Sequence, residues 1–420
     1  MNVAILSYHT CPLATLGGKD TGGMNVYVRD LTRYLGMHGI HADVFTRSQD
    51  EHVPHVLHDL GCGNRVVHIP AGPESPLPKI ELKQHIPQFT AGICAFAEQK
   101  NIRYDLIHSH YWLSGLAAEE LKKSWDKPVI SMFHTLALLK NRIAKNPQEI
   151  ESDLRIEGER EAITISDKIV AATSDEKTHL EDLYQTPSEK IAVIPPGVDI
   201  TRFYPIPADE AKEFVGIPKD ERMLLFVGRI EPLKGIDILI RAIAQLRHAD
   251  VLSECPHYLY IIGGEPDADN QNMNQEMRRL QNLCRELGVG DLVLFLGKRD
   301  QDTLQYYYSA AEIVVMPSHY ESFGMVALEA MACGTPVIAT QVGGLQHLVQ
   351  NGVTGFTVPN DNVEVLEERL TQLICKQDMR TEMGRNSITY ARSYAWDVIT
   401  PRMIDLYKQT IRDYESFQER

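Results

Sequence analysis

The sequence predicts an α/β protein built from two doubly wound, Rossmann-like domains. Short apolar runs alternate with helical stretches along both halves, which is typical of a parallel sheet covered on both faces. A proline-rich break interrupts this alternation near the middle of the chain. A length of 420 residues exceeds what one ordinary hydrophobic core holds, so two domains are expected.

The first domain is predicted over residues 1–197. The segment Met24–Met37 has helical periodicity and follows a polar, glycine-rich loop. Six apolar runs in this half are interpreted as strands: Val3–Leu6, Ala42–Thr46, Asp105–His108, Val129–Phe133, Ile169–Ala172 and Ile191–Ile194.

The second domain is predicted over residues 205–395. The segments Pro195–Asp199 and Phe203–Pro207 each contain two prolines, which continue neither a helix nor a strand, so the linker is placed there. The alternation then restarts, with strands expected at Met223–Val227, Tyr258–Ile262, Val293–Leu296, Ile313–Met316 and Pro336–Ala339. Residues 396–420 are expected to form a helix that packs back on the first domain. Ligands of such sheets bind at the carboxyl ends of the strands, so the two domains are expected to face each other across a cleft.

The composition of the chain limits the classes of partner and the cellular location that are expected. The formal net charge is −15, which disfavours nucleic acid and anionic membrane as main partners. The seven cysteines are scattered without a CxxC pair, as in proteins with reduced thiols. The chain starts with an apolar strand and contains no apolar run long enough to cross a bilayer, so a cytoplasmic protein is expected.

The segment Pro317–Glu329 carries two glutamates between a buried strand and a helix. Glu321 lies in the intervening loop, and Glu329 lies about two turns into the helix. A helix N-terminus favours an anion, and ionised carboxylates accept hydrogen bonds from hydroxyls. Phosphates beside hydroxyls describe a nucleotide sugar. The alternative is a chance pair of glutamates on a solvated helix.

Two further loops suit phosphates. The glycine-rich turn that ends at Gly22 and Gly23 allows close approach to the backbone, although it lacks GxGxxG spacing and a flexible surface loop explains it equally well. Arg229 and Lys234 follow a strand and provide two fixed cations for a diphosphate leaving group, in place of a metal ion. Ordinary exposed basic residues are the alternative for this pair.

Metal motifs are weak in this sequence. His108 and His110 follow one strand and His134 another, but no third ligand accompanies the His-x-His pair, so no metal site is predicted. Asp267-Ala-Asp269 matches a DxD pattern, yet its polar surroundings favour a solvated loop.

Eight segments in order resemble the retaining glycosyltransferases of family four, which have the two-domain GT-B fold. They are TGGMNVYV, HSHYWLSG, FHTLALLKN, PPGVD, FVGRIEPLKG, PSHYESFGMVALE, GTPVIAT and NGVTGFTV. The resemblance implies catalytic roles for His134, Arg229, Lys234 and Glu321. It implies a nucleotide-sugar site formed by Gly22, Gly23, Arg229, Lys234, Arg299, Glu321, Ser322, Phe323, Gly324, Met325, Val326 and Glu329. In that site Arg229 and Lys234 hold the diphosphate, Glu329 the ribose, and Arg299 lies by the uracil. No metal or other cofactor is obligatory in this family.

The resemblance also implies a phosphorylated acceptor. Two family groups are the most similar: the mycothiol-pathway enzyme that transfers GlcNAc from UDP to inositol phosphate, and sucrose-phosphate synthase. The implied acceptor residues are Asn25, Lys79, Tyr111, His134, Thr135 and Arg155. The segment TLALLKN resembles the first group, whereas the overall composition is unlike that of the alanine-rich proteins of mycothiol producers. UDP-glucose and fructose 6-phosphate are therefore favoured as substrates, with UDP-GlcNAc and inositol phosphate as the alternative.

Other functions remain open at this level. A UDP-sugar epimerase shares the fold and needs no acceptor, and a nucleotide-sugar sensor would keep the pocket without its reactive residues. Transfer to a membrane lipid would need a basic amphipathic helix, for which Leu136–Lys145 is a short candidate. The sequence leaves open whether the protein forms a homo-oligomer.

Overall fold

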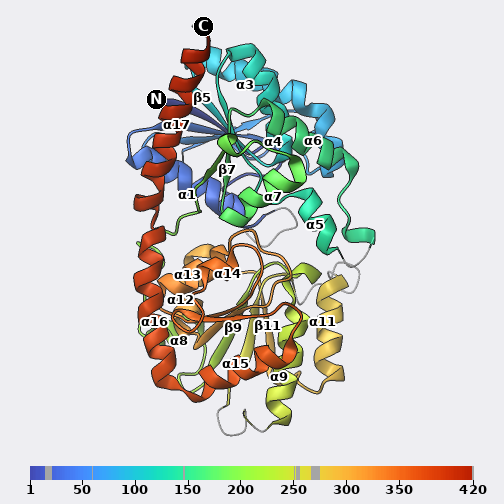
Figure 1. Cartoon of the computed structure of the whole chain (residues 1–420), viewed down its shortest axis with the longest axis vertical. Coiled ribbons are helices and arrows are strands. Elements are labelled where there is room, and N and C mark those ends of the chain that lie inside the picture. The colour runs from blue at the N-terminus through green and yellow to red at the C-terminus, as the bar shows by residue number, and fades with distance from the viewer. Residues whose placement is uncertain are drawn as a thin grey trace. The chain divides into compact units, whose positions relative to one another are not determined.

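The computed structural model describes residues 1–14, 21–58, 60–144, 147–249, 251, 256–265 and 275–418, without the side chain of Gln148. The chain divides into two compact units. Unit 1 consists of Met1–Ala14, Gly23–Gly197 and the segment from Trp396 onward, and unit 2 contains Val198–Ala395 together with Thr21 and Gly22. Each unit has one sheet with helices on both faces (Figure 1). The predicted α/β class is therefore confirmed.

Unit 1 contains an eight-stranded sheet in the order β3-β4-β2-β1-β5-β6-β7-β8. Its strands are β1 (Asn2–Leu6), β2 (His41–Arg47), β3 (Val56–Leu57), β4 (Arg65–Ile69), β5 (Leu106–His110), β6 (Val129–Met132), β7 (Lys168–Ala171) and β8 (Ile191–Val193). All neighbours pair in parallel except the edge strand β3, which runs antiparallel to β4. The central strands are buried because helices cover both faces.

The helices of unit 1 form two layers (Figure 1). They are α1 (Gly23–Met37), α2 (Lys79–Leu82), α3 (Ile86–Lys100), α4 (Trp112–Trp125), α5 (Ala137–Ile143), α6 (Asp153–Ile165), α7 (Ser174–Tyr184) and α17 (Trp396–Gln418). On one face, α17 contacts α1. There the Trp396 ring lies 5.5 Å from the Tyr27 ring, and the Tyr407 hydroxyl lies 2.6 Å from Nδ1 of His108. On the other face, α4 contacts α3 and α6.

Unit 2 contains a six-stranded parallel sheet in the order β11-β10-β9-β12-β13-β14. Its strands are β9 (Met223–Val227), β10 (Tyr258–Ile262), β11 (Val293–Gly297), β12 (Ile313–Met316), β13 (Val337–Thr340) and β14 (Gly355–Val358). Its helices are α8 (Ala208–Val215), α9 (Ile236–His248), α11 (Gln275–Glu286), α12 (Gln301–Ala310), α13 (Met325–Ala332), α14 (Leu345–Leu348), α15 (Val363–Cys375) and α16 (Gln377–Ala391). Buried aliphatic residues of β9, β10 and α9 dominate its core.

Strand order places the functional loops. In a doubly wound sheet the binding crevice opens where the strand order reverses. In unit 1 this point lies between β1 and β5, and in unit 2 it lies between β9 and β12. The loops that follow these strands begin at Ser7, Tyr111, Gly228 and Pro317.

Three strands, β3, β4 and β14, were not predicted from the sequence. β4 reads Arg-Val-Val-His-Ile, and two of its five residues are polar enough to interrupt an apolar run. β14 begins with Gly355, whose added Cβ would lie 1.9 Å from the carbonyl oxygen of Val337 on β13, so only glycine fits there. Strands β4 and β14 form because a parallel neighbour completes their backbone hydrogen bonds, which is a tertiary effect.

No helix in the described part of the chain has both the length and the apolar character needed to span a bilayer.

Candidate functional site

The predicted acceptor residues of unit 1 gather around the ring of Tyr111. The Lys79 ammonium lies 5.4 Å from the ring centroid, and the Arg155 guanidinium carbon lies 4.9 Å from it. Arg155 Nη2 donates to the Thr135 hydroxyl at 2.9 Å and to the Thr135 carbonyl at 3.0 Å. The structure thus brings together two cations, from helices α2 and α6, and two hydroxyl-bearing residues from the loops after β5 and β6, although the residues are far apart in sequence.

Arg155 is held in place from behind. Its side chain is about 5% exposed, and it pairs with Glu159 at 2.9 Å and with Glu151 at 2.8 Å. Glu159 itself is fully buried and accepts hydrogen bonds from the backbone N–H of Ala137. This network fixes the guanidinium against Tyr111, so Arg155 has both a structural and a site-facing part.

His134, which is partly buried, lies against the buried imidazoles of His108 and His110. Nε2 of His134 lies 3.0 Å from Nδ1 of His110. Burial lowers the pKa of His134 to about 3, and burial followed by the nearby His108 and His134 lowers that of His110, so both rings are neutral near pH 7. His134 and Tyr111 both have positive φ, at 62° and 74°, a conformation that is uncommon for residues other than glycine. Such backbone strain is frequent at functional sites.

His9 is a residue of this group that the sequence analysis missed. Its ring centroid lies 4.6 Å from that of Tyr111, and burial, followed by Lys79, His134 and Arg155, holds its pKa well below the ordinary value. Among the described residues, its Nδ1 is buried without a hydrogen-bond partner. The available signal was its position just after the first strand, at the carboxyl edge of the sheet.

Asn25, another predicted acceptor residue, lies in the first turn of α1. Its amide nitrogen donates to Oγ1 of Thr10 at 2.7 Å and to the carbonyl of Cys11 at 2.8 Å. The side chain therefore ties α1 to the loop after β1, which also carries His9.

In unit 2 the loops after β9 and β12 meet. Lys234 Nζ lies 2.5 Å from Oε2 of Glu321, and both side chains are less than one-fifth exposed. Arg229 pairs with Glu231 at 2.9 Å and is 40% exposed. A Cβ added at Gly22 would lie 3.9 Å from Nε of Arg229. The structure thus gathers Gly22, Arg229, Lys234 and Glu321, but each cation has a carboxylate partner rather than standing alone.

Glycines make this approach feasible. Gly235 has φ +61°, and an added Cβ would lie 2.0 Å from the carbonyl oxygen of Pro317. Gly343 has φ +44°, and its added Cβ would lie 1.9 Å from the carbonyl oxygen of Glu321. Side chains at these positions would separate the loops that carry Lys234 and Glu321.

The glycine-rich start of α13 provides an anion-binding geometry. Gly324 caps the helix with φ 105°, and no side chain occupies the cap. The first-turn N–H groups at Met325 and Val326 therefore have no intrahelical acceptor. Phe323 is buried and lies 5.8 Å from the Tyr394 ring, so its side chain packs in unit 2 while the backbone around Ser322 continues into the helix.

Glu329 lies within α13 and is 4% exposed. It accepts a hydrogen bond from the Tyr308 hydroxyl at 2.8 Å, with Gln301 at 3.5 Å. Arg299 donates to the Tyr307 hydroxyl at 2.8 Å and to the carbonyl of Lys298 at 2.8 Å.

The described residues contain no group of three or more His, Cys, Asp and Glu side chains arranged for a metal ion. Asp267-Ala-Asp269 lies outside the described residues.

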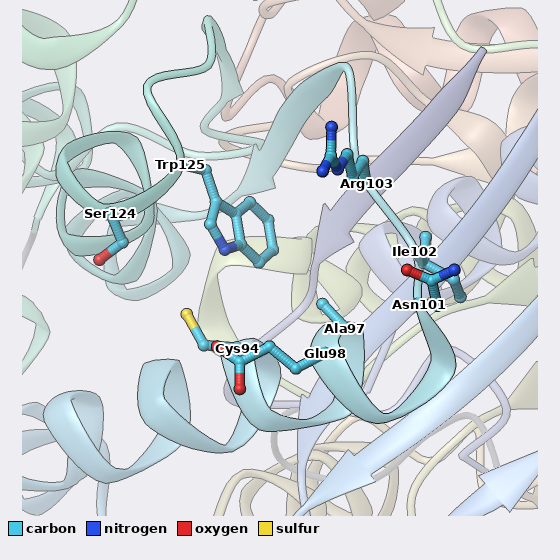
Figure 2. A pocket seen from close by; sticks show the side chains of 8 residues that line it. All are labelled: Cys94, Ala97, Glu98, Asn101, Ile102, Arg103, Ser124 and Trp125. Atoms are coloured by element: carbon cyan, nitrogen blue, oxygen red, sulfur yellow. The ribbon is translucent and has the colours of Figure 1, made fainter.

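Two cavities, each of about 320 Å³, lie near the amino ends of strands in the unit 1 sheet, whereas the predicted site loops follow the carboxyl ends. One is lined by residues at the ends of α3 and α4 and by Ile102 and Arg103, which precede β5 (Figure 2). The other is lined by residues near the amino ends of β1, β2 and β4. Neither contains a predicted site residue, because those residues follow the strands rather than precede them.

Comparison with known proteins shows the family to which the chain belongs. A model of Glycosyltransferase Family 4 matches residues 21–202, and a model of Glycosyl transferases group 1 matches residues 207–390. The D-inositol 3-phosphate glycosyltransferase of Actinosynnema mirum is 39% identical over 97% of each chain. A sucrose-phosphate synthase structure from Thermosynechococcus elongatus is 32% identical, with a TM-score of 0.88 over 98% of this chain and 99% of that one. An Anabaena protein in complex with UDP and glucose, 20% identical, shares the fold with a TM-score of 0.75 over 97% of this chain and 100% of that one. The chain therefore belongs to family 4 of the glycosyltransferases and has their GT-B fold.

Proposed function

We propose that the protein transfers a hexosyl unit from a UDP-sugar to a phosphorylated acceptor, with retention of configuration. The observation that carries this proposal is the group of Lys79, Tyr111, Thr135 and Arg155 in unit 1. Two cations beside two hydroxyl groups suit a phosphate, because charge-assisted hydrogen bonds to phosphate oxygens are short and strong.

The donor is proposed to bind in unit 2. Arg229 and Lys234 would hold the diphosphate, with the N-terminus of α13 beside it, and Glu329 would accept hydrogen bonds from the ribose hydroxyls. Binding of the diphosphate would separate Lys234 from Glu321 and leave Glu321 to contact the sugar. No metal or other cofactor is needed in this scheme, since the two cations stabilise the negative charge of the leaving group.

The reaction is proposed to proceed on one face of the sugar. The acceptor hydroxyl attacks the anomeric carbon as the bond to the UDP oxygen breaks, and the departing phosphate takes the hydroxyl proton. Arg229 and Lys234 stabilise the charge that grows on that phosphate, and His134 contacts the sugar.

For the acceptor, inositol phosphate is the first candidate. Relatives 37–39% identical over nearly the full chain are named for D-inositol 3-phosphate, and the segment after His134 resembles that group. Fructose 6-phosphate, which composition favours, is the second candidate, because the 32% identical structure with a TM-score of 0.88 is named for sucrose phosphate.

The test is release of UDP by the purified protein. UDP-GlcNAc and UDP-glucose are each combined with inositol 3-phosphate, fructose 6-phosphate, their unphosphorylated counterparts, or no acceptor. Release that requires a phosphorylated acceptor supports the proposal, and proton NMR of the product then reads the anomeric configuration. Equal release with unphosphorylated acceptors contradicts it, and loss of UDP-sugar without any acceptor indicates an epimerase or hydrolase instead.

A further inference from the structure

Arg47, the last residue of β2, has no role in the site described above and yet is almost fully buried at 1% exposure. Its guanidinium donates to three backbone carbonyls. Nε reaches the carbonyl of Ala71 at 2.8 Å, Nη1 and Nη2 reach that of Ser75 at 3.1 Å, and Nη2 also reaches that of Pro73. All three acceptors lie in the loop between β4 and α2.

Residues 70–78 belong to no helix or strand, and the prolines at 70, 73, 76 and 78 have no N–H to donate. Besides the bonds to Arg47, the Gly72 N–H donates to Oε1 of Gln88 at 2.8 Å, and the Ser75 N–H donates to the Pro73 carbonyl at 2.9 Å. A buried carbonyl needs a donor, and the planar guanidinium provides several in a fixed geometry. A second tie supports the first, since the Ser48 hydroxyl donates to Glu74 at 2.5 Å.

The loop ends at Lys79, the first residue of α2, whose ammonium lies near Tyr111. The far end of α2 is fixed as well, because the Tyr8 hydroxyl donates to the carbonyl of Leu82 at 2.8 Å. Because the guanidinium is buried where it meets the carbonyls, desolvation lowers the pKa of Arg47.

We infer that Arg47 is a positioning residue for the acceptor: by clamping the loop 71–75 it holds the Lys79 ammonium at the acceptor phosphate. The role in acceptor binding rests on the proposed function, whereas the clamp itself does not.

The kinetic test uses Arg47→Met, which keeps an unbranched side chain out to the position of Nε and removes all the guanidinium donors. The acceptor KM should rise at least tenfold, while kcat and the donor KM change less than twofold. Adding Arg47→Met to Lys79→Ala should raise the acceptor KM less than twofold further, because the clamp acts through Lys79. Additive effects in the double variant, or equal losses for donor and acceptor, would overturn the inference.

Arg65→Met is the matched control. Arg65 is the first residue of β4, the strand that pairs with β2, so it lies at the opposite end of this strand pair from Arg47. It pairs with Asp43 at 2.7 Å. Its loss should lower the melting temperature without changing the acceptor KM. Should Arg47→Met fail to fold, Arg47→Lys retains the charge but not the fork. That variant should show the same selective rise in acceptor KM at smaller size, and a uniform loss in all constants would count against the inference.

Hydrogen exchange of the free protein tests the clamp without any substrate. The amides of Ala71, Gly72, Glu74 and Ser75 should exchange at least tenfold faster in Arg47→Met than in wild type or Arg65→Met. Unchanged exchange would overturn the clamp. Absence of turnover with every phosphorylated acceptor in the wild type would instead overturn the proposed function, and with it the acceptor role of Arg47.

Discussion

Lys234 and Glu321 form a close ion pair in unit 2, with side chains that are largely shielded from solvent. An ion pair exposed to water contributes little to the stability of a fold, but a shielded pair holds both charged groups in a defined position. Under the proposed function, the lysine is already oriented before the diphosphate binds, and binding costs its bond to Glu321.

Replacing this lysine should mainly slow the chemical step. Lys234→Ala is expected to lower kcat by about 10²- to 10³-fold, since it removes a donor that stabilises charge in the transition state. Steady-state kinetics of UDP release measures this effect. Lys219→Ala, which breaks the exposed pair with Glu213, serves as the control and should leave kcat unchanged. A Lys234→Ala enzyme with normal kcat would remove Lys234 from the mechanism.

Replacing either Lys79 or Arg155 should weaken acceptor binding, but only the loss of Arg155 should also destabilise the fold. Lys79→Ala is expected to raise the acceptor KM at least about tenfold with an unchanged melting temperature, because a charge-assisted bond to phosphate is lost. Arg155→Ala should raise the KM too, but it also leaves Glu159 buried without its cation, which costs about 3–5 kcal/mol of stability. Calorimetry beside kinetics distinguishes the two. A stable Arg155→Ala protein would contradict the structural part of this role.

At the scale of elements, the approach of the loops after β9 and β12 depends on Gly235. Gly235→Ala places a Cβ against the Pro317 carbonyl and should weaken UDP binding at least about tenfold, as overpacking shifts the backbone. Gly216→Ala is the matched control, because Gly216 has φ +73° with no neighbouring atom within 4 Å. Both variants carry the positive-φ strain, so titration calorimetry isolates the effect of the clash. Equal UDP affinity in both would argue against it.

Helix α7 contains a buried carboxyl group in its first turn. The Thr173 hydroxyl caps the helix by accepting from the N–H of Glu176, and the Glu176 carboxylate accepts from the N–H of Ala172 at 2.6 Å. Burial nevertheless raises the pKa of Glu176 from 4.5 to about 7. The folded state thus binds this proton more tightly than the unfolded state does.

The sign of the pH dependence follows from that rise. The contribution of Glu176 to stability is fully present below about pH 4.5 and is lost as the pH increases to about 7. At 1.36 kcal/mol per pKa unit, the total loss is about 3 kcal/mol. Glu176→Gln should therefore raise the melting temperature at pH 8 and leave it unchanged at pH 4. Glu181→Gln, on the same helix but partly exposed, should shift neither. A pH-independent effect of Glu176→Gln would show that the carboxyl group does not titrate in this range.

At the scale of the whole molecule, the two units differ in how the chain builds them. Unit 2 is almost continuous, from Val198 to Ala395, and contains its complete six-stranded sheet. Unit 1 needs the returning helix α17, whose Trp396 and Tyr407 are fully buried against it.

Fragments should behave accordingly. Residues 198–395 are expected to unfold cooperatively on heating and to bind UDP, whereas residues 1–197 should lack a cooperative transition because α1 and β5 lose their cover. Removal of a buried Trp side chain alone lowers the free energy of unfolding by about 3–5 kcal/mol. Thermal denaturation followed by circular dichroism compares the two fragments. A cooperative transition in 1–197 would show that α17 is dispensable for folding.

The sequence by itself determined the α/β class and the loops that carry the site residues, because apolar runs and glycine or proline boundaries are local features. Through resemblance to a family, it also predicted that Lys79, Tyr111, Thr135 and Arg155 bind the acceptor. Only the tertiary structure decided that these four lie together, that Lys234 is paired with Glu321, and that Arg47 is buried beneath the loop leading to Lys79. The order of the strands brings loops distant in sequence to one edge of a parallel sheet. That order depends on long-range pairing, which no local pattern contains.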